Sequence, residues 1–238
     1  MGNNFGPSEV LLSMQIAGKR FLVAGASGAL GGELVRQLGA KGATILGTAS
    51  SNETAGNIPA QVEIRLLLDL TRPESIKTLT DYLNAAGDID GIINASGVVA
   101  FGEAKDLTPE TISALMAINA AGPMQLFASL AESLSKKEEA VVVNLTGVVA
   151  ERALPGLAAY SASKMAINGF LEGVTREWRK AGTVVISARP GHTETGLADR
   201  AIAGQAPAFP QGMTAEQVAS RIIAAIENDE RDLPASEF

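Results

Sequence analysis

The chain has 238 residues, of which 46% are hydrophobic and 19% charged, so it suits one globular domain with a full core and is not a disordered chain. Its net charge of −7 disfavours a nucleic-acid partner, which needs a basic face. With no cysteine, and one histidine outside any metal-ligating pattern, we expect neither a disulfide nor a metal site.

The first residues are expected to lie outside the domain. We predict a loosely ordered extension over residues 1–13, followed by a single domain over residues 14–238. The short apolar run at residues 10–12 has no basic segment before it, so it is not a signal peptide. Because we find no apolar run of membrane-spanning length, we expect a cytoplasmic protein with no membrane partner.

Short apolar runs alternate with helix-periodic segments along the domain. The predicted strands span 19–24, 43–48, 62–68, 89–95, 140–145 and 183–188. The predicted helices span 29–41, 73–86, 109–135, 156–180 and 215–228, with Pro73 at a first helical position and Thr108 as an N-cap. Continuous apolar strands are typical of a parallel sheet covered on both faces. We therefore predict a doubly wound α/β domain with six or seven parallel strands and helices on both faces.

A glycine-rich loop, GASGALG at residues 25–31, joins the first strand to the first helix. Glycines here permit a tight turn and let backbone N–H groups approach a pyrophosphate at the helix N-terminus. The alternative is a tight turn with no ligand, but the strand–glycine–helix context favours a dinucleotide. The predicted contacts in the loop are Gly25, Ser27, Gly28, Leu30 and Gly31.

The end of the second strand indicates which dinucleotide binds. A carboxylate there would bind a ribose 2′-hydroxyl and repel a 2′-phosphate, but Ala49, Ser50 and Ser51 stand in its place, with no acid before Glu53. The hydroxyls of Ser50 and Ser51 can donate to phosphate, although no arginine accompanies them. NADP(H) is therefore favoured, and NAD(H) stays possible.

A tyrosine and a lysine four residues apart, Tyr160 and Lys164, lie near the start of a predicted helix and share one face of it. A tyrosine is a weak acid–base catalyst at neutral pH, and a nearby cation is expected to lower its pKa. Alone, this spacing is also compatible with an ordinary surface pair.

Taken together and in order, these motifs resemble the short-chain dehydrogenase/reductase family, with a Rossmann-type domain, over about residues 14–228. The motifs are the glycine loop, Asn94-Ala95-Ser96-Gly97, Asn119, Tyr160 with Lys164, and Pro190-Gly191. The resemblance implies that Tyr160 is the general acid/base, that Lys164 tunes it and binds the nicotinamide ribose, and that Asn119 supports a proton-relay water. It also implies cofactor contacts at Asp69, Leu70, Asn94, Ala95, Ser96, Pro190, Gly191, Thr193 and Thr195.

The chain departs from the family pattern at the position thirteen residues before the tyrosine. The family has a serine there that hydrogen-bonds the reacting oxygen, and this chain has Gly147. Thr146 is the candidate replacement, provided that the strand end is bulged or already a loop. Without a replacement, activity is expected to be weak, and Gly147→Ser is expected to raise it. The acidic glycine-rich motif that usually ends the family's last strand is also missing.

The predicted function is hydride transfer between a nicotinamide cofactor and a carbonyl or secondary alcohol. The alternative is a dinucleotide-binding sensor or regulator with impaired catalysis, which only Gly147 supports. A predicted lid over residues 196–213 is rich in alanine and apolar residues, so we expect a neutral or hydrophobic small-molecule substrate. Small residues on the helix over 156–180 also favour a homo-oligomer, a dimer or a tetramer.

Overall fold

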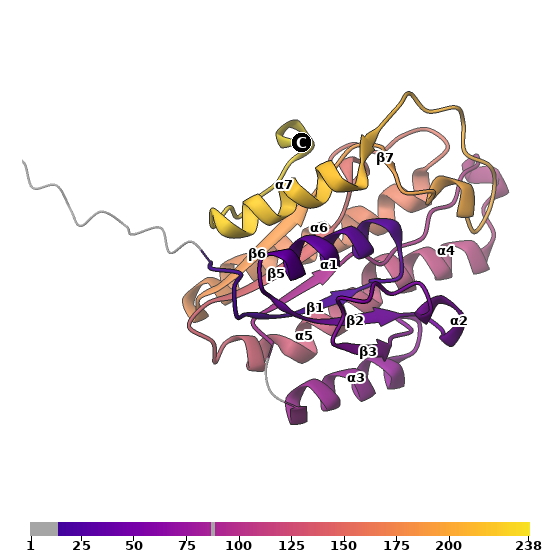
Figure 1. The fold of residues 1–238 in the computed structure, drawn as a ribbon. Coiled ribbons are helices and arrows are strands. Elements are labelled where there is room, and N and C mark those ends of the chain that lie inside the picture. Colours follow the sequence, from indigo (N-terminus) through magenta and orange to yellow (C-terminus); the bar gives the residue numbers. More distant parts are fainter. Residues whose placement is uncertain (1–13, 87–88) are drawn as a thin grey trace, which may run out of the picture.

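Six parallel strands form the central sheet, in the order β3-β2-β1-β4-β5-β6 (Figure 1). The structure is a computed structural model that describes residues 14–86 and 89–238, so the predicted extension over 1–13 lies outside its described residues. The strands are β1 (Arg20–Ala24), β2 (Thr44–Ala49), β3 (Ile64–Leu67), β4 (Gly91–Asn94), β5 (Ala140–Leu145) and β6 (Thr183–Ala188). The predicted parallel sheet is confirmed, with six strands.

Helices cover both faces of this sheet. They are α1 (Ala29–Ala40), α2 (Asn52–Ala55), α3 (Pro73–Ala86), α4 (Pro109–Met116), α5 (Gly122–Leu134), α6 (Ala158–Trp178) and α7 (Ala215–Glu227). The buried residues of α1 and α7 share one core cluster, and those of α3, α5 and α6 share another. This is the predicted doubly wound arrangement.

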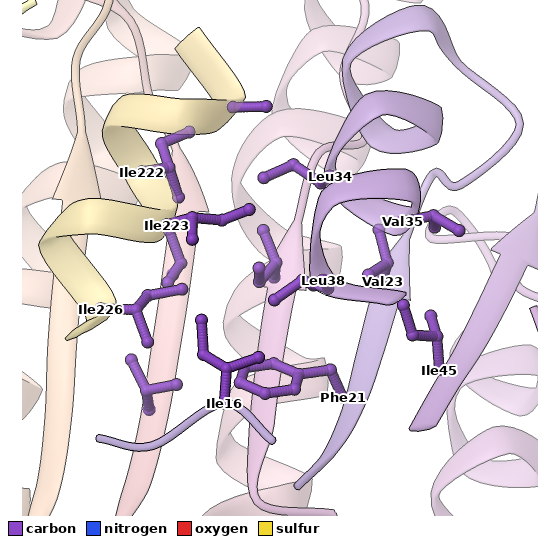
Figure 2. Packing of buried hydrophobic residues seen from close by; sticks show 14 of the residues in the cluster. Ile16, Phe21, Val23, Leu34, Val35, Leu38, Ile45, Ile222, Ile223 and Ile226 are labelled. Atoms are coloured by element: carbon purple, nitrogen blue, oxygen red, sulfur yellow. The ribbon is translucent and has the colours of Figure 1, made fainter. Parts of the chain in front are cut away.

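Alternate residues of each central strand supply the two cores. Phe21 and Val23 of β1 pack toward α1 and α7, where Figure 2 shows them among Leu38 and Ile222. Their neighbour Leu22 faces the opposite cluster. Because both faces of a strand are buried in this way, apolar residues are favoured at successive positions, which explains the continuous apolar runs in the sequence.

The strand order reverses between β1 and β4, which are neighbours although two strands separate them in the chain. The chain winds outward to β3 on one side of β1, and then to β6 on the other. Ala24 pairs with Asn94, and Asn94 pairs with Asn144, so the carboxyl ends of three strands meet at this point. Doubly wound sheets bind ligands in the crevice at such a reversal, and below the crevice means this region at the carboxyl ends of β1, β4 and β5.

The helix predicted over 109–135 is interrupted, because a π-helical turn at Ala117–Ala121 separates α4 from α5. Pro123 follows this turn and has no N–H to donate to the carbonyl of Asn119, four residues earlier. The missing donor accounts for the break in the regular α-helical hydrogen bonds. The predicted N-cap is confirmed, since the Thr108 side chain accepts a hydrogen bond from the N–H of Thr111.

The same stretch, Pro109–Leu134, is the one helix among the described residues that is long and apolar enough to cross a membrane, with a mean hydropathy of 1.3. The expectation that no segment reaches that length was therefore wrong. In this fold, 44% of its most apolar part is buried, and α5 packs against α3, the sheet and α6. A core helix of this kind passes the same test, so the finding is weak support for a membrane span.

Two short elements complete the carboxyl end of the domain. β7 (Thr193–Glu194) and β8 (Met213–Thr214) pair in parallel and enclose the predicted lid. A seventh strand is reduced to a bridge between Ala188 and Leu233, whose carbonyl accepts a hydrogen bond from the N–H of Arg189.

Candidate active site

The glycine loop leaves α1 with an open N-terminus. No side chain caps α1 at Gly28, and a Cβ at Gly31 would lie 2.1 Å from the carbonyl oxygen of Gly25, so only glycine fits. Gly25 has φ of +78°, and its N–H donates to Thr48 Oγ1 at 3.2 Å. The free N–H groups and the positive end of the helix dipole provide a cradle that fits a pyrophosphate.

The two serines after β2 play different structural roles. Ser51 accepts a hydrogen bond from the N–H of Thr54 in a capping box of α2, so its side chain is already engaged. Ser50 is exposed, and it is the serine whose hydroxyl is available to a ligand at this strand end. Ala49 is only 1% exposed and belongs to the core, so it is poorly placed to contact a ribose.

Asp69 follows β3 and Asn94 ends β4, two strands that β2 and β1 separate in the sheet. Asp69 Oδ1 accepts hydrogen bonds from the backbone and the side chain of Thr71, at 2.9 and 2.6 Å. Asn94 is buried. Its Nδ2 donates a hydrogen bond to Asn144 Oδ1 at 2.7 Å, and its Oδ1 accepts one from the N–H of Ser96 at 3.2 Å. Asn94 therefore shapes the turn that contains Ala95 and Ser96.

Lys164 and Tyr160 are adjacent on α6, as their spacing predicts. Lys164 Nζ lies 5.9 Å from the Tyr160 ring centroid and donates to the carbonyl oxygen of Leu145 at 2.8 Å. Burial raises the pKa of Tyr160 to about 12 and lowers the pKa of Lys164 to about 8. Desolvation of the phenol is the cause of the rise, so the tyrosine pKa moves in the direction opposite to the lowering expected from the lysine.

Asn119 lies in the π-helical turn and faces the same crevice. Its Oδ1 accepts from the N–H of Val98, and its Nδ2 donates to the Val98 carbonyl, each at 2.9 Å. Its Nδ2 also lies 3.0 Å from Ser163 Oγ, whose hydroxyl donates to the Tyr160 carbonyl. A Cβ at Gly97 would lie 3.2 Å from Asn119 Oδ1 and 3.4 Å from Lys164 Nζ, which places these groups side by side.

Thr146 points away from this group into the interior. Its side chain is fully buried, and Thr146 Oγ1 lies 2.8 Å from Ser187 Oγ. It also accepts from Asn144 Nδ2 at 3.2 Å, and Ser187 in turn donates to Asn168 Oδ1 at 2.7 Å. The threonine hydroxyl is therefore engaged in a network of buried hydrogen bonds.

Gly147 occupies a backbone conformation that other residues avoid. Its φ of +86° and ψ of +157° lie in a region that only glycine populates readily. Space is available, because the nearest atom to an added Cβ would be Pro190 O at 3.9 Å. Backbone strain, and not crowding, is thus the obstacle to a serine here.

The turn after β6 borders the other side of the crevice. The Pro190 carbonyl accepts from the N–H of Val148, and Thr193 Oγ1 donates to the Gly191 carbonyl at 3.1 Å. The N–H of Thr195 donates to the carbonyl of Thr193. His192 stacks on Phe209 of the lid, with ring centroids 4.7 Å apart.

The lid is docked over Tyr160 by backbone and apolar contacts. The N–H of Phe101 donates to the Ala203 carbonyl, and the N–H of Ile202 donates to the Val99 carbonyl. A small apolar cluster around Tyr160 brings residues of the domain together with residues of the lid; it includes Val99, Phe101, Val149 and Leu157 from the domain and Leu197, Ala198, Ala201 and Ala206 from the lid. Ile202 and Phe209, two large apolar residues of the lid, are 42% and 38% exposed.

Two residues near the site were not predicted from the sequence. Ser187 interrupts an otherwise apolar strand, which is a detectable sign of a buried polar contact. Arg189 pairs with Glu151 and Asp232, and these long-range partners cannot be read from spacing. Among residues 14–86 and 89–238, no group of three His, Cys, Asp or Glu side chains could hold a metal ion.

Comparison with known proteins assigns the fold and the site to a class. The chain matches the family model for short chain dehydrogenase over residues 19–206. It is 30% identical over 186 residues to a 3-oxoacyl-[acyl-carrier-protein] reductase of Haemophilus influenzae, covering 76% of this chain and 77% of that relative. The chain therefore belongs to the short-chain dehydrogenase/reductase family of oxidoreductases.

Solved structures agree with this assignment. A short chain dehydrogenase of Burkholderia cenocepacia in complex with NADP is 25% identical, with a TM-score of 0.80, over 93% of this chain and 98% of that one. A short-chain dehydrogenase of Sphingobium yanoikuyae in complex with NADPH is 22% identical, with a TM-score of 0.83, over 91% and 87% of the two chains. The second likeness concerns the fold alone.

Proposed function

We propose that the protein is a cytoplasmic NADP(H)-dependent oxidoreductase that interconverts a neutral, apolar carbonyl compound and its secondary alcohol. The juxtaposition of Tyr160, Lys164 and Asn119 beneath an apolar lid is the observation that carries this proposal. The Haemophilus relative's name describes it as a reductase, and the Burkholderia structure contains NADP. Both support a nicotinamide-dependent reduction here.

The residues at the strand ends fit the cofactor. The loop Gly25–Gly31 would hold the pyrophosphate on the α1 N-terminus, Ser50 the adenosine ribose phosphate, and Lys164 the nicotinamide ribose. When bound, the nicotinamide supplies or accepts the hydride.

Tyr160 supplies the proton in the reductive direction. With its pKa raised to about 12 by burial, the phenol stays protonated at neutral pH and can donate to the carbonyl oxygen. Lys164 lies beside the Tyr160 ring, and Asn119 reaches the backbone carbonyl of Tyr160 through Ser163. The Asn119 carbonyl, to which Pro123 has no N–H to donate, would accept the hydrogen bond of a relay water.

The experiment is turnover of a panel of apolar ketones and aldehydes, followed by loss of NADPH absorbance. Tyr160→Phe should abolish turnover and leave NADPH binding within about twofold of the parent, as measured by calorimetry. The second candidate, a dinucleotide-binding sensor, is favoured only by Gly147, which lacks the usual serine hydroxyl. NADPH binding with no turnover on any substrate would support the sensor and contradict the proposal.

A further inference from the structure

A buried arginine at the end of β6 joins three segments that are distant in the sequence. The Arg189 side chain is 10% exposed, and its Nε donates to Glu151 Oε1 at 2.6 Å. Its Nη1 and Nη2 lie 2.7 and 2.9 Å from the two carboxylate oxygens of Asp232. A fork of this kind fixes both position and orientation of the carboxylate.

Arg189 and Glu151 belong to two different loops beside the active site, which together we call the frame of the site. Arg189 itself precedes the Pro190–Gly191 turn that borders the crevice. Glu151 ends the 3₁₀ turn Val148–Ala150, in which the Ala150 N–H donates to the Gly147 carbonyl. That turn carries Val149, a member of the apolar cluster around Tyr160.

The second partner of Arg189, Asp232, belongs to the carboxyl-terminal segment 232–235, which we call the tail. Glu151 Oε1 also accepts the N–H of Ala235 at 3.0 Å, so the tail binds this one carboxylate as well as Arg189. Leu233 is fully buried and pairs with the backbone of Ala188 and Arg189. Burial raises the pKa of Glu151, but hydrogen bonds from Arg189 and Ala235 outweigh it, so that pKa lies below its ordinary value and the carboxylate is ionised at neutral pH.

We propose that the tail is a positioning element of the active site, acting through Asp232 and Ala235 on Arg189 and Glu151 to hold the Gly147–Glu151 loop against the Pro190–Gly191 turn. The proposal rests on the proposed function for its catalytic consequence, but its structural consequence does not depend on turnover. Removing the Asp232 charge should loosen the loop next to Tyr160, about 80 residues away in the sequence.

The chain offers a matched control for Asp232→Asn. Glu230 lies two residues before Asp232, outside the tail, and forms a similar fork with Arg221 of α7, at 3.0 and 2.7 Å. The buried face of α7 packs on α1, and the hydrogen bonds of Arg221 go to Glu230 and Glu237 and not to the loop. Glu230→Gln therefore removes an equivalent ion pair without touching the frame of the site.

The first measurement is hydrogen–deuterium exchange of the peptide that contains residues 148–152, with no substrate present. Asp232→Asn should accelerate its exchange at least about fivefold, whereas Glu230→Gln should leave it unchanged. Ala235→Pro, which removes the N–H that Glu151 accepts, should act in the same direction as Asp232→Asn. Equal exchange at residues 148–152 in all variants would overturn the proposal, whatever the protein catalyses.

The second measurement is steady-state turnover. Misplacement of the loop should raise the KM for the carbonyl substrate about fivefold in Asp232→Asn, with Asp232→Glu restoring most of the loss. A purely structural role would lower the folded fraction and the apparent kcat, but it would leave KM unchanged, and that result would contradict the proposal. If the parent enzyme turns over no substrate, the proposed function fails while the exchange experiment still decides this inference.

Discussion

The hydroxyl oxygens of Thr146 and Ser187 lie 2.8 Å apart, at the carboxyl ends of the neighbouring strands β5 and β6. This contact turns Thr146 away from the crevice that contains Tyr160. It therefore favours a lost hydroxyl donor over one relocated to Thr146.

Thr146→Val tests this directly. The change leaves Ser187 without one buried partner, so we expect the free energy of unfolding to fall by about 1–3 kcal/mol. We expect kcat to change less than about tenfold, whereas removal of a catalytic donor would cost about 100- to 1,000-fold. Urea denaturation and turnover measure the two effects, and a loss of kcat in the larger range would show that Thr146 is the donor.

Gly147→Ser should destabilise the protein and not accelerate it. A serine at φ of +86° and ψ of +157° is strained by about 1–3 kcal/mol, and relief of that strain would move the loop. The sequence-based expectation that this serine raises the rate assumed an ordinary backbone. Gly173→Ser on α6, where an added Cβ meets nothing within 4 Å, is the control for melting temperature. A faster and equally stable Gly147→Ser enzyme would refute this prediction.

Lys164 should make stability depend on pH in the alkaline range. Its pKa is about 8 in the folded chain against an ordinary 10.5, so between these values the unfolded chain binds more protons, and stability rises with pH. The rise is on the order of 3 kcal/mol if the whole shift is expressed. The raised pKa of Tyr160 lowers stability as pH rises, but only above its ordinary pKa of 10.0, where the unfolded chain loses a proton that the folded chain retains. The test is urea denaturation from pH 7.5 to about 9.5, which covers the lower part of this pH range. The free energy of unfolding should rise with pH in the parent and stay constant in Lys164→Met.

Cofactor preference should depend on Ser50. Ser50→Asp places a carboxylate at the exposed end of β2, where it would repel a 2′-phosphate, so we expect NADPH affinity to fall at least about tenfold while NADH affinity holds or improves. Ala49→Asp would instead bury a charge in the core and unfold the protein. Calorimetric titration with both dinucleotides measures the two affinities. An unchanged NADPH affinity in Ser50→Asp would show that the 2′-phosphate binds away from Ser50.

A homodimer remains the expected assembly. The outer face of α6 exposes small residues, including Ala158, Ala162 and Gly169, that permit close approach of a second helix. Gly169→Arg should block that approach and give a monomer by light scattering at micromolar concentration. A parent that is already monomeric would contradict the prediction.

The fold could be predicted because its determinants are local. β5 and β6 were predicted with their observed bounds, since each is a run of apolar residues that only a doubly covered strand needs. The π turn was missed, because a hydrophobic period measured over many residues does not register one added residue. Pro123 within an otherwise helical pattern was the available sign.

The candidate site was predictable only in part. Spacing alone could place Tyr160 and Lys164 together, but their pKa values depend on how tightly the lid covers them. The partners of Arg189 lie 38 and 43 residues away, and no local pattern connects them. The direction of the Thr146 side chain likewise depends on its partner in another strand.

The π turn at Ala117–Ala121 also sets a limit on how this chain can change in length. One added residue rotates the two halves of the helix by about 100° relative to each other, and the fully buried Leu115 and Leu126 each face the core in that offset register. Deleting a residue between them would give a more regular helix, yet it would turn one leucine out of the core and Asn119 out of the crevice. In a library of single-residue insertions and deletions, this stretch should therefore be among the least tolerant, although regular helices of similar exposure elsewhere accept such changes near their ends.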